Sequence, residues 1–147
     1  MIRNLLVPLD GTPLAERAMQ DSIALARQLG ASITGFVAEP DPPMPHEGSS
    51  MTRYMKERKA HGVQADTHAH ELLSRFGALA HAAGVVFSGR HQRTDYIDQA
   101  IASVADEIDD VMIVMVTHGR GAFGGLLCGS RTKQVMTLTK APLLVLH

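Results

Sequence analysis

The sequence predicts an α/β fold built on a parallel β-sheet. Short apolar runs alternate with amphipathic helical segments in the order β-α-β-α-β-α-β-α-β, the pattern of strands joined by crossover helices. Right-handed crossovers leave few arrangements for such a chain. A length of 147 residues suffices for one hydrophobic core, so we expect a single domain over residues 1–147.

The chain begins with an expected strand, helix and strand. The apolar run at residues 2–9 is the first strand. Thr12 and Pro13 mark a helix start, with Thr12 as N-cap and Pro13 in the first helical position, and Gly30 is the expected C-cap. Residues 31–37 are apolar and rich in β-branched side chains, which predicts the second strand.

A loop and a long helical region separate the second strand from the third. Residues 39–50 hold four prolines and a glycine and predict a loop. The helical region covers about residues 51–83, and Gly62 is a candidate interruption. The short apolar run Val85-Val86-Phe87 is the expected third strand.

The last part of the chain repeats the alternation of helix and strand. Apolar residues at near-ideal helical spacing predict a helix over residues 97–108. The run at residues 111–116 predicts a buried fourth strand, a helix follows from near Ser130, and residues 143–146 form the fifth strand.

The composition excludes several classes of protein. A net charge of −1 gives no sign of nucleic-acid binding, and no apolar run approaches the length of a membrane span. The single cysteine, Cys128, rules out an internal disulfide, which fits a reducing compartment. The N-terminal residues show no signal-peptide pattern. We therefore expect a cytoplasmic protein with neither a nucleic-acid nor a membrane partner.

A glycine-rich segment after the fourth strand indicates an anion site. The strand opens into residues 117–125, which hold four glycines, and Gly129-Ser130 then start a helix. Glycines let backbone N–H groups approach a phosphate, and a helix N-terminus supplies free donors and partial positive charge. Residues 111–147 contain four basic residues and no acidic one, which favours an anion near this segment.

Two common phosphate-binding patterns do not fit this segment. Residues 119–124 match the letters of the dinucleotide fingerprint G-x-G-x-x-G, but they follow the fourth strand and no acidic residue occurs after Asp110. Gly124 to Gly129 resembles part of a P-loop, but Ser130 stands where the P-loop needs a lysine. A dinucleotide oxidoreductase and a Walker-type NTPase are therefore disfavoured.

A different template accounts for the whole segment. Gly119, nine intervening residues and Gly129-Ser130 resemble the nucleotide-binding motif of the universal stress protein family. Residues 7–10 resemble the end of that family's first strand, and residues 141–145 resemble its last strand. The resemblance implies an open, twisted, three-layer fold of the adenine nucleotide alpha hydrolase-like (Rossmann-like) type, with a five-stranded parallel sheet in the order 3-2-1-4-5.

The resemblance also implies a ligand and the residues that hold it. The implied ligand is ATP or AMP, bound with or without Mg²⁺. Adenine would lie near Pro8, Asp10 and Val37 at the ends of the first two strands, and the phosphates at Gly119, Gly129 and Ser130. Further expected contacts around the Gly-rich loop and the start of the last helix come from His118, Arg120, Arg131 and Thr132.

Several of these residues have a simpler interpretation. Asp10 can accept hydrogen bonds from an adenine amine or a ribose hydroxyl, but Asp10-Gly11 is also a common turn pair. Ser130 can bind phosphate, cap the last helix, or do both. The eight histidines include four in the long helical region, where solvated side chains are a better interpretation than a metal site.

Val116 is the departure from the family pattern, because it stands where the motif has its first glycine. Its side chain is expected to crowd the ribose, although it is also an ordinary strand residue. The leading hypothesis is a nucleotide-binding stress-response or signalling module that acts as a homodimer through residues 143–146. An interaction protein that has lost nucleotide binding is the second hypothesis. A slow ATPase ranks last, since no general base or metal-binding acid stands near the loop.

Overall fold

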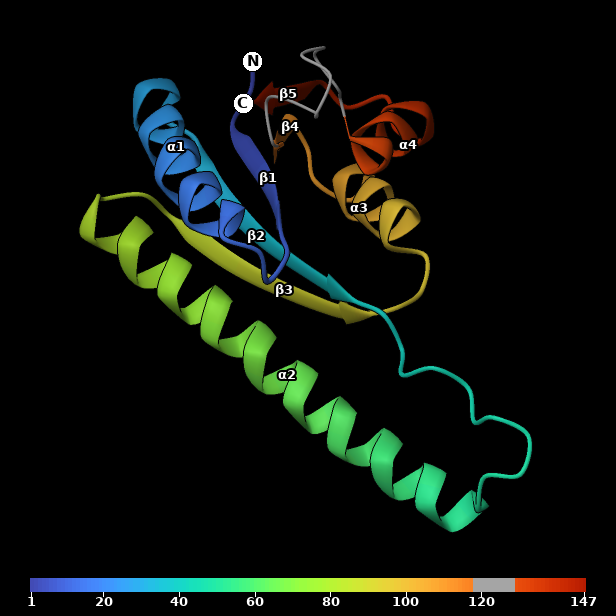
Figure 1. Cartoon of the computed structure of the whole chain (residues 1–147). Helices are drawn as coiled ribbons and strands as arrows, with labels where there is room; N and C mark the ends of the chain where they lie inside the picture. Colours follow the sequence, from blue (N-terminus) through green and yellow to red (C-terminus); the bar gives the residue numbers. More distant parts are fainter. Residues whose placement is uncertain (118–128) are drawn as a thin grey trace.

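The structure is a computed structural model, and it describes residues 1–117 and 129–147. Its centre is a five-stranded parallel sheet in the order β3-β2-β1-β4-β5 (Figure 1). The elements in chain order are β1 (Asn4–Leu9), α1 (Leu14–Leu29), β2 (Ser32–Glu39), α2 (Met51–Ala82), β3 (Phe87–Arg93), α3 (Ile97–Asp106), β4 (Val111–Val116), α4 (Ser130–Leu138) and β5 (Leu143–Leu146). The predicted α/β class and strand order 3-2-1-4-5 are confirmed.

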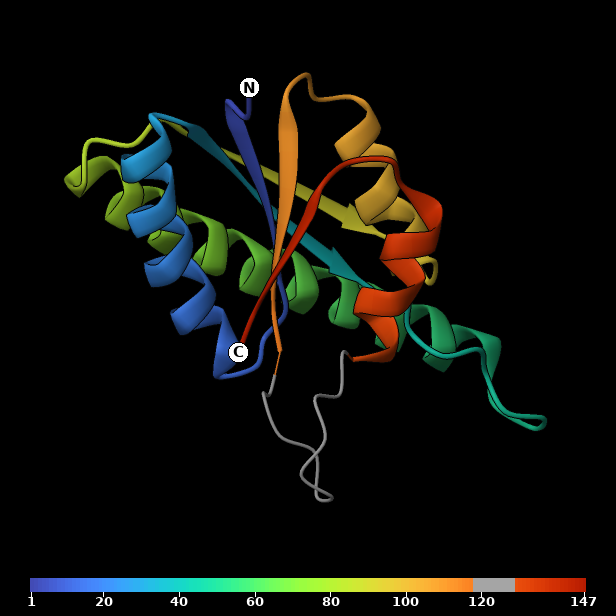
Figure 2. The ribbon, with the colours of Figure 1, turned by 90° about the horizontal axis from the view of Figure 1, so that it is seen from above.

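Helices cover both faces of the sheet, which gives three layers. Helices α1 and α2 lie on one face, and α3 and α4 lie on the other (Figures 1 and 2). The alternation of side chains along β1 supplies both cores: Leu5 and Val7 pack with α1 and α2, whereas Leu6 packs with α3 and α4. All three side chains are fully buried. The middle strands are therefore apolar on both faces, as expected for a parallel sheet covered by crossover helices.

The third strand differs from the prediction. Residues 85–87 were expected to form it, but β3 covers Phe87–Arg93 and uses the polar sequence that follows. Val85 is buried, yet it precedes the strand, and Val86 is exposed. Strand β3 is a sheet edge with one neighbour, and six of its seven residues are exposed, so an apolar sequence is not needed there. A search for apolar runs therefore cannot predict a polar edge strand.

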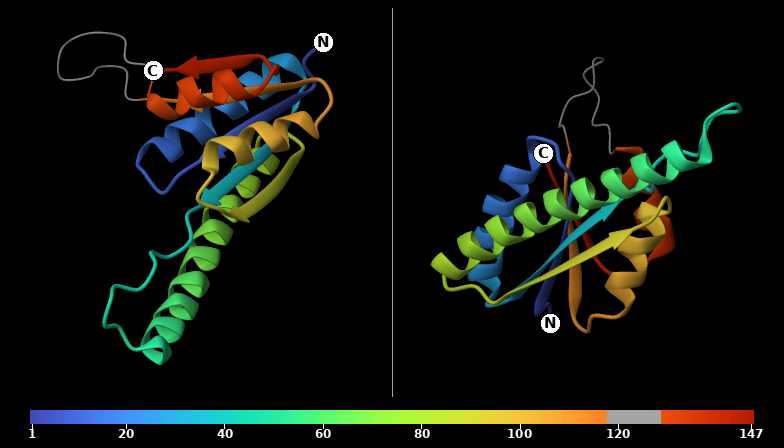
Figure 3. Two further views of the ribbon diagram at one scale, coloured as in Figure 1. Left: turned by 90° about the vertical axis from the view of Figure 1, so that its right-hand side faces the viewer. Right: turned by 90° about the horizontal axis from the view of Figure 1, so that it is seen from below.

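Helix α2 is continuous over 32 residues and has no interruption at Gly62. Gly62 is instead a contact point: a Cβ there would lie 2.6 Å from Nη1 of Arg93. Arg93 in turn pairs with Asp66 on the same helix at 3.1 Å. A second polar contact joins Nδ1 of His68 to Oε1 of Glu39 at 3.1 Å, so this histidine is not merely solvated. The N-terminal part of α2 extends beyond the sheet (Figure 3).

Two helix starts also differ in detail from the prediction. Helix α1 begins at Leu14 with Pro13 in the N-cap position, because the hydroxyl of Thr12 donates to Asp10 instead of capping the helix. Gly30 adopts the left-handed conformation, with φ of 65°, and is the C-cap as predicted. Helix α4 begins at Ser130 with Gly129 as N-cap. Among the described residues, no helix is both long and apolar enough to cross a membrane.

Pro8 lies where the central strands stop pairing. The N–H of Asn4 donates to the carbonyl of Asp110, on the β4 side. Backbone N–H and C=O groups point to alternate sides along a strand, so those of residues 6 and 8 also face β4. Proline has no N–H to donate. The pairing of β1 with β4 ends at Leu6, opposite Ile113, whereas the pairing of β1 with β2 continues to Leu9. The carboxyl ends of β1 and β4 are thus left unpaired with each other.

The docking of α2 gives the first prediction. Phe76 is fully buried and its ring centroid lies 5.0 Å from that of Phe87. Replacing Phe76 by Ala removes this packing and leaves a cavity, which should lower the free energy of unfolding by roughly 3–5 kcal/mol. Urea denaturation measures the change. Val63→Ala on the same helix is the control: Val63 is 61% exposed, so its change should stay within about 0.5 kcal/mol. Similar losses in both variants would contradict this packing.

Candidate functional site

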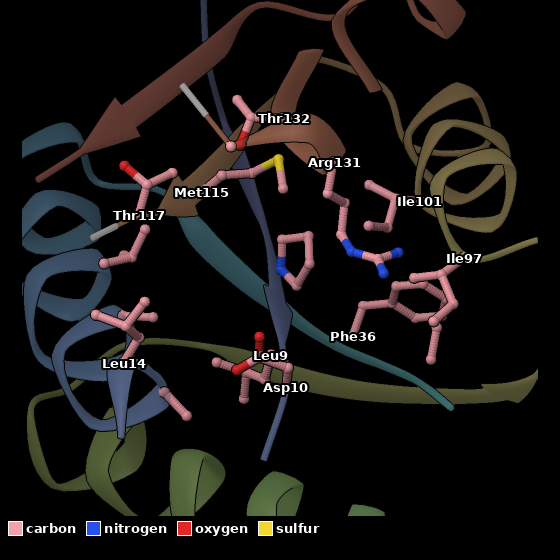
Figure 4. A pocket seen from close by; sticks show the side chains of 16 residues that line it. Leu9, Asp10, Leu14, Phe36, Ile97, Ile101, Met115, Thr117, Arg131 and Thr132 are labelled. Atoms are coloured by element: carbon pink, nitrogen blue, oxygen red, sulfur yellow. The ribbon is translucent and has the colours of Figure 1, made fainter. Parts of the chain in front are cut away.

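A pocket opens at the carboxyl ends of β1 and β4, where their pairing has stopped. Its volume is about 340 Å³, within the range of small-molecule sites. The chain leaves β1 towards β2 on one side and reaches β4 on the other, and ligands of open α/β sheets bind at such switch points. Figure 4 shows the lining, which consists of Pro8, Leu9, Asp10, Leu14, Ala15, Ala18, Phe36, Ala38, Ile97, Ile101, Met115, Val116, Thr117, Gly129, Arg131 and Thr132.

One end of the pocket is an apolar wall. Phe36 and Ala38 reach it from β2, and Ile97 and Ile101 reach it from the first turns of α3. Phe36 and Ile101 are each 1% exposed, so the wall is continuous with the core under α3 and α4. An apolar surface of this kind suits a flat, weakly polar ring.

Asp10 provides a carboxylate at the mouth of the pocket, directly after β1. Its Oδ1 accepts from the backbone N–H of Thr12 at 3.1 Å and from the Thr12 hydroxyl at 2.5 Å. Both bonds use the same oxygen, which fixes the carboxylate and leaves Oδ2 to accept from a ligand. The turn interpretation and the binding interpretation of Asp10 are therefore compatible.

The N-terminus of α4 borders the pocket opposite α1. Gly129 is its N-cap, and among the described residues no atom lies within 4 Å of where a Cβ at Gly129 would stand. The free N–H groups of the first turn of α4 carry partial positive charge at this point. Thr132, also on the first turn, is 2% exposed and lines the pocket.

Val116 and Thr117 close the pocket from the end of β4. Val116 is half-buried and packs against the core under α1. The Thr117 hydroxyl lies 3.1 Å from Nδ1 of His147, and Arg17 of α1 donates to the backbone carbonyl of His147. The chain end is thus tied to the same rim of the sheet as the pocket.

Arg131 is the cation of the described lining. Its Nη1 donates to Oδ1 of Asp98 at 2.9 Å, which joins the first turn of α4 to the first turn of α3. The side chains of Arg131 and Asp98 are 50% and 28% exposed. No motif predicts this pairing, because Asp98 is 33 residues away from Arg131 and belongs to no recognisable pattern.

The structure brings together six of the residues expected around the ligand: Pro8, Asp10, Val116, Gly129, Arg131 and Thr132 all line the pocket. Val37 and Ser130 are not in the lining. The side chain of Val37 is 1% exposed and packs on the other face of the sheet, while its neighbours Phe36 and Ala38 reach the pocket. His118, Gly119 and Arg120 lie outside the described residues.

Sequence reasoning missed the apolar wall. Ile97 and Ile101 were recognised only as the buried face of a helix, and nothing separated them from other core residues. Phe36 lies in the second strand, and which residues of that strand face the pocket could not be assigned from one sequence. As for metals, the described ranges 1–117 and 129–147 contain no group of three or more side chains placed to hold an ion.

Comparisons with known proteins agree with this fold. The model of the universal stress protein family matches residues 1–147. A universal stress protein of Archaeoglobus fulgidus in complex with dAMP is 20% identical, with a TM-score of 0.65 and 100% of each chain covered. A universal stress protein in complex with cAMP is 20% identical, with a TM-score of 0.67, 99% of this chain and 97% of the other.

A third solved structure, of a hypothetical protein whose biochemical function was assigned from its structure, is similar over a comparable range. It has a TM-score of 0.77 at 17% identity and covers 99% of this chain and 96% of its own. No curated protein matches the sequence. The structural likenesses give the adenine nucleotide alpha hydrolase-like fold, and the family model spans every residue of the chain. The chain belongs to the universal stress protein family.

Proposed function

We propose that this protein binds an adenine nucleotide, ATP or AMP, in the pocket between β1, β4 and α4. The observation that carries the proposal is the convergence of Asp10, Gly129 and an apolar wall on one cavity at the switch point of the sheet. Two structures similar to this chain are complexes with cAMP and with dAMP, which supports adenine nucleotides as the ligand class.

The lining suggests an orientation for the nucleotide. The apolar wall of Phe36, Ala38, Ile97 and Ile101 suits the adenine ring. Oδ2 of Asp10 is placed to accept from a ribose hydroxyl or the adenine amine. The N–H groups at Gly129 and the start of α4, with the Ser130 hydroxyl, suit the phosphates.

The proposed biological role is a cytoplasmic stress-response or signalling module that acts as a homodimer through β5. Strand β5 is an edge of the sheet, and all four of its residues, Leu143–Leu146, are apolar and only partly buried. Thr117 donates to the carbonyl of Leu146, so the backbone groups of Leu143 and Val145 face away from β4. Antiparallel pairing with a second copy would satisfy these groups across a two-fold axis.

Val116 supports a second candidate, a dimeric protein of the same fold that binds no nucleotide. Its side chain stands in the pocket where the family motif has glycine. The isopropyl group would then exclude the ribose, and the edge at β5 would carry the function alone.

Titration of ATP and AMP by calorimetry tests the proposal, with Gly129→Val as the matched variant. The wild-type protein should bind, and the variant should lose at least about tenfold in affinity, roughly 1.4 kcal/mol, because a branched side chain blocks backbone approach to phosphate. The variant should keep its fold, since a Cβ at Gly129 would meet no atom of residues 1–117 and 129–147 within 4 Å. If the wild-type protein gave no heat of binding at millimolar nucleotide, the proposal would be refuted.

Val116→Gly separates the two candidates. Removing the side chain should tighten nucleotide binding by about tenfold if it crowds the ribose. The same change should lower the stability of the free protein by about 1 kcal/mol, since glycine weakens a strand. Binding is followed by calorimetry and stability by urea denaturation. An unchanged affinity together with the expected loss of stability would show that Val116 does not restrict the site.

Light scattering at micromolar concentration tests the dimer. The expected mass is twice the 15.8 kDa of one chain. Val145→Pro should give a folded monomer, because it removes an N–H that faces solvent at the edge and none that pairs with β4. Circular dichroism checks that the variant is folded. A wild-type mass of one chain, or a Val145→Pro variant that still dimerises, would refute assembly through β5.

A further inference from the structure

Arg131 occupies a position that helix stability does not explain. It lies in the first turn of α4, where partial positive charge disfavours a cation, and this turn has no acidic residue. Its counter-charge comes from Asp98 in the first turn of α3, where a carboxylate is favourable. The ion pair therefore bridges two helix N-termini at the edge of the pocket.

The side chain of Arg131 lies within the pocket and reaches across it. Figure 4 shows its guanidinium extending to the side of the pocket where Ile97 and Phe36 lie. The 2.9 Å bond to Asp98 holds it there. A guanidinium in this place takes up room along the apolar wall, which is the part of the cavity best suited to a nucleotide base.

The same side chain belongs to the segment expected to bind phosphate. Arg131 follows Gly129 and Ser130 directly, and its long, flexible stem allows the guanidinium to reach either Asp98 or an anion at the start of α4. Arginine binds phosphate through two parallel, charge-assisted hydrogen bonds. Its pairing with Asp98 uses one nitrogen at a half-exposed position, which is a weak arrangement. A phosphate is thus the stronger partner.

We propose that the Arg131–Asp98 ion pair is a latch over the base end of the pocket, and that the phosphates of an entering nucleotide release it. Arg131 leaves Asp98 for the phosphates, which clears the apolar wall for the base. The latch makes the site select nucleotides over nucleosides, because a nucleoside must displace Arg131 without offering it an anion. This inference rests on the proposed nucleotide site.

Binding of ATP and adenosine to Arg131→Met and Asp98→Asn, measured by calorimetry, tests the latch. Arg131→Met should bind adenosine about two- to fivefold more tightly than the wild-type protein, the range expected for losing a half-exposed ion pair that competes with the ligand. Its ratio of ATP to adenosine affinity should fall by about tenfold or more, since the phosphate contact is gone. Asp98→Asn should tighten both ligands by about two- to fivefold, because it frees Arg131 without removing it.

Lys133→Met is the matched control, since it removes the same charge from an exposed position of α4 outside the pocket lining. It should leave the affinity ratio unchanged. Weaker adenosine binding by Arg131→Met, or an unchanged ratio of ATP to adenosine affinity, would overturn the latch. The proposed nucleotide site would still stand if the wild-type protein binds ATP. Adenosine binding by Arg131→Met alone would show that Arg131 blocks the base end of the pocket, but it would overturn release by phosphates together with nucleotide binding by the native protein. No binding by the wild-type protein or either pocket variant would overturn both proposals.

Discussion

The early end of pairing between β1 and β4 is the constraint on which the pocket depends. Strand β1 keeps its bonds to β2 as far as Leu9, but its bonds to β4 end at Leu6, and Pro8 cannot donate the next one. A proline in a central strand is otherwise unfavourable, since it removes a ladder bond. Here that absence coincides with the switch point of the sheet, and the separated strand ends leave room for side chains from both layers of helices to line one cavity.

Much of the fold could be predicted because its signals are local. The apolar runs of β1, β4 and β5 and the spacing of α3 each report burial directly, and Gly30 marks the end of α1 through its left-handed backbone. The strand order came from a family resemblance. The polar strand β3 and the continuity of α2 through Gly62 could not be predicted, because no apolar run marks β3 and a glycine within a helical pattern weakens the prediction of an unbroken helix.

In the candidate site too, features with a local sequence signal could be predicted, and features that depend on distant contacts could not. Asp10 and Gly129 could be placed near one another from sequence, since parallel strands end at one edge, and both line the pocket. The pairing of Arg131 with Asp98 could not, because charge complementarity between two distant helix starts appears only when the helices are packed. The side chain of Val37 lies outside the pocket lining for a related reason: a strand's facing alternates with every residue, so a shift of one position moves a side chain from the pocket to the opposite core.

The two edges of the sheet have opposite character. Strand β3 presents polar residues with arginine and histidine among them, whereas the side chains of β5 are all apolar. A sheet that grows from one molecule to the next needs two edges on each molecule that can pair with a further strand. Of the two edges of the described sheet, only β5 is apolar, and pairing of β5 with its own copy, as proposed above, would leave only the two β3 edges outward. Assembly through β5 would therefore disfavour open-ended polymerisation into fibres.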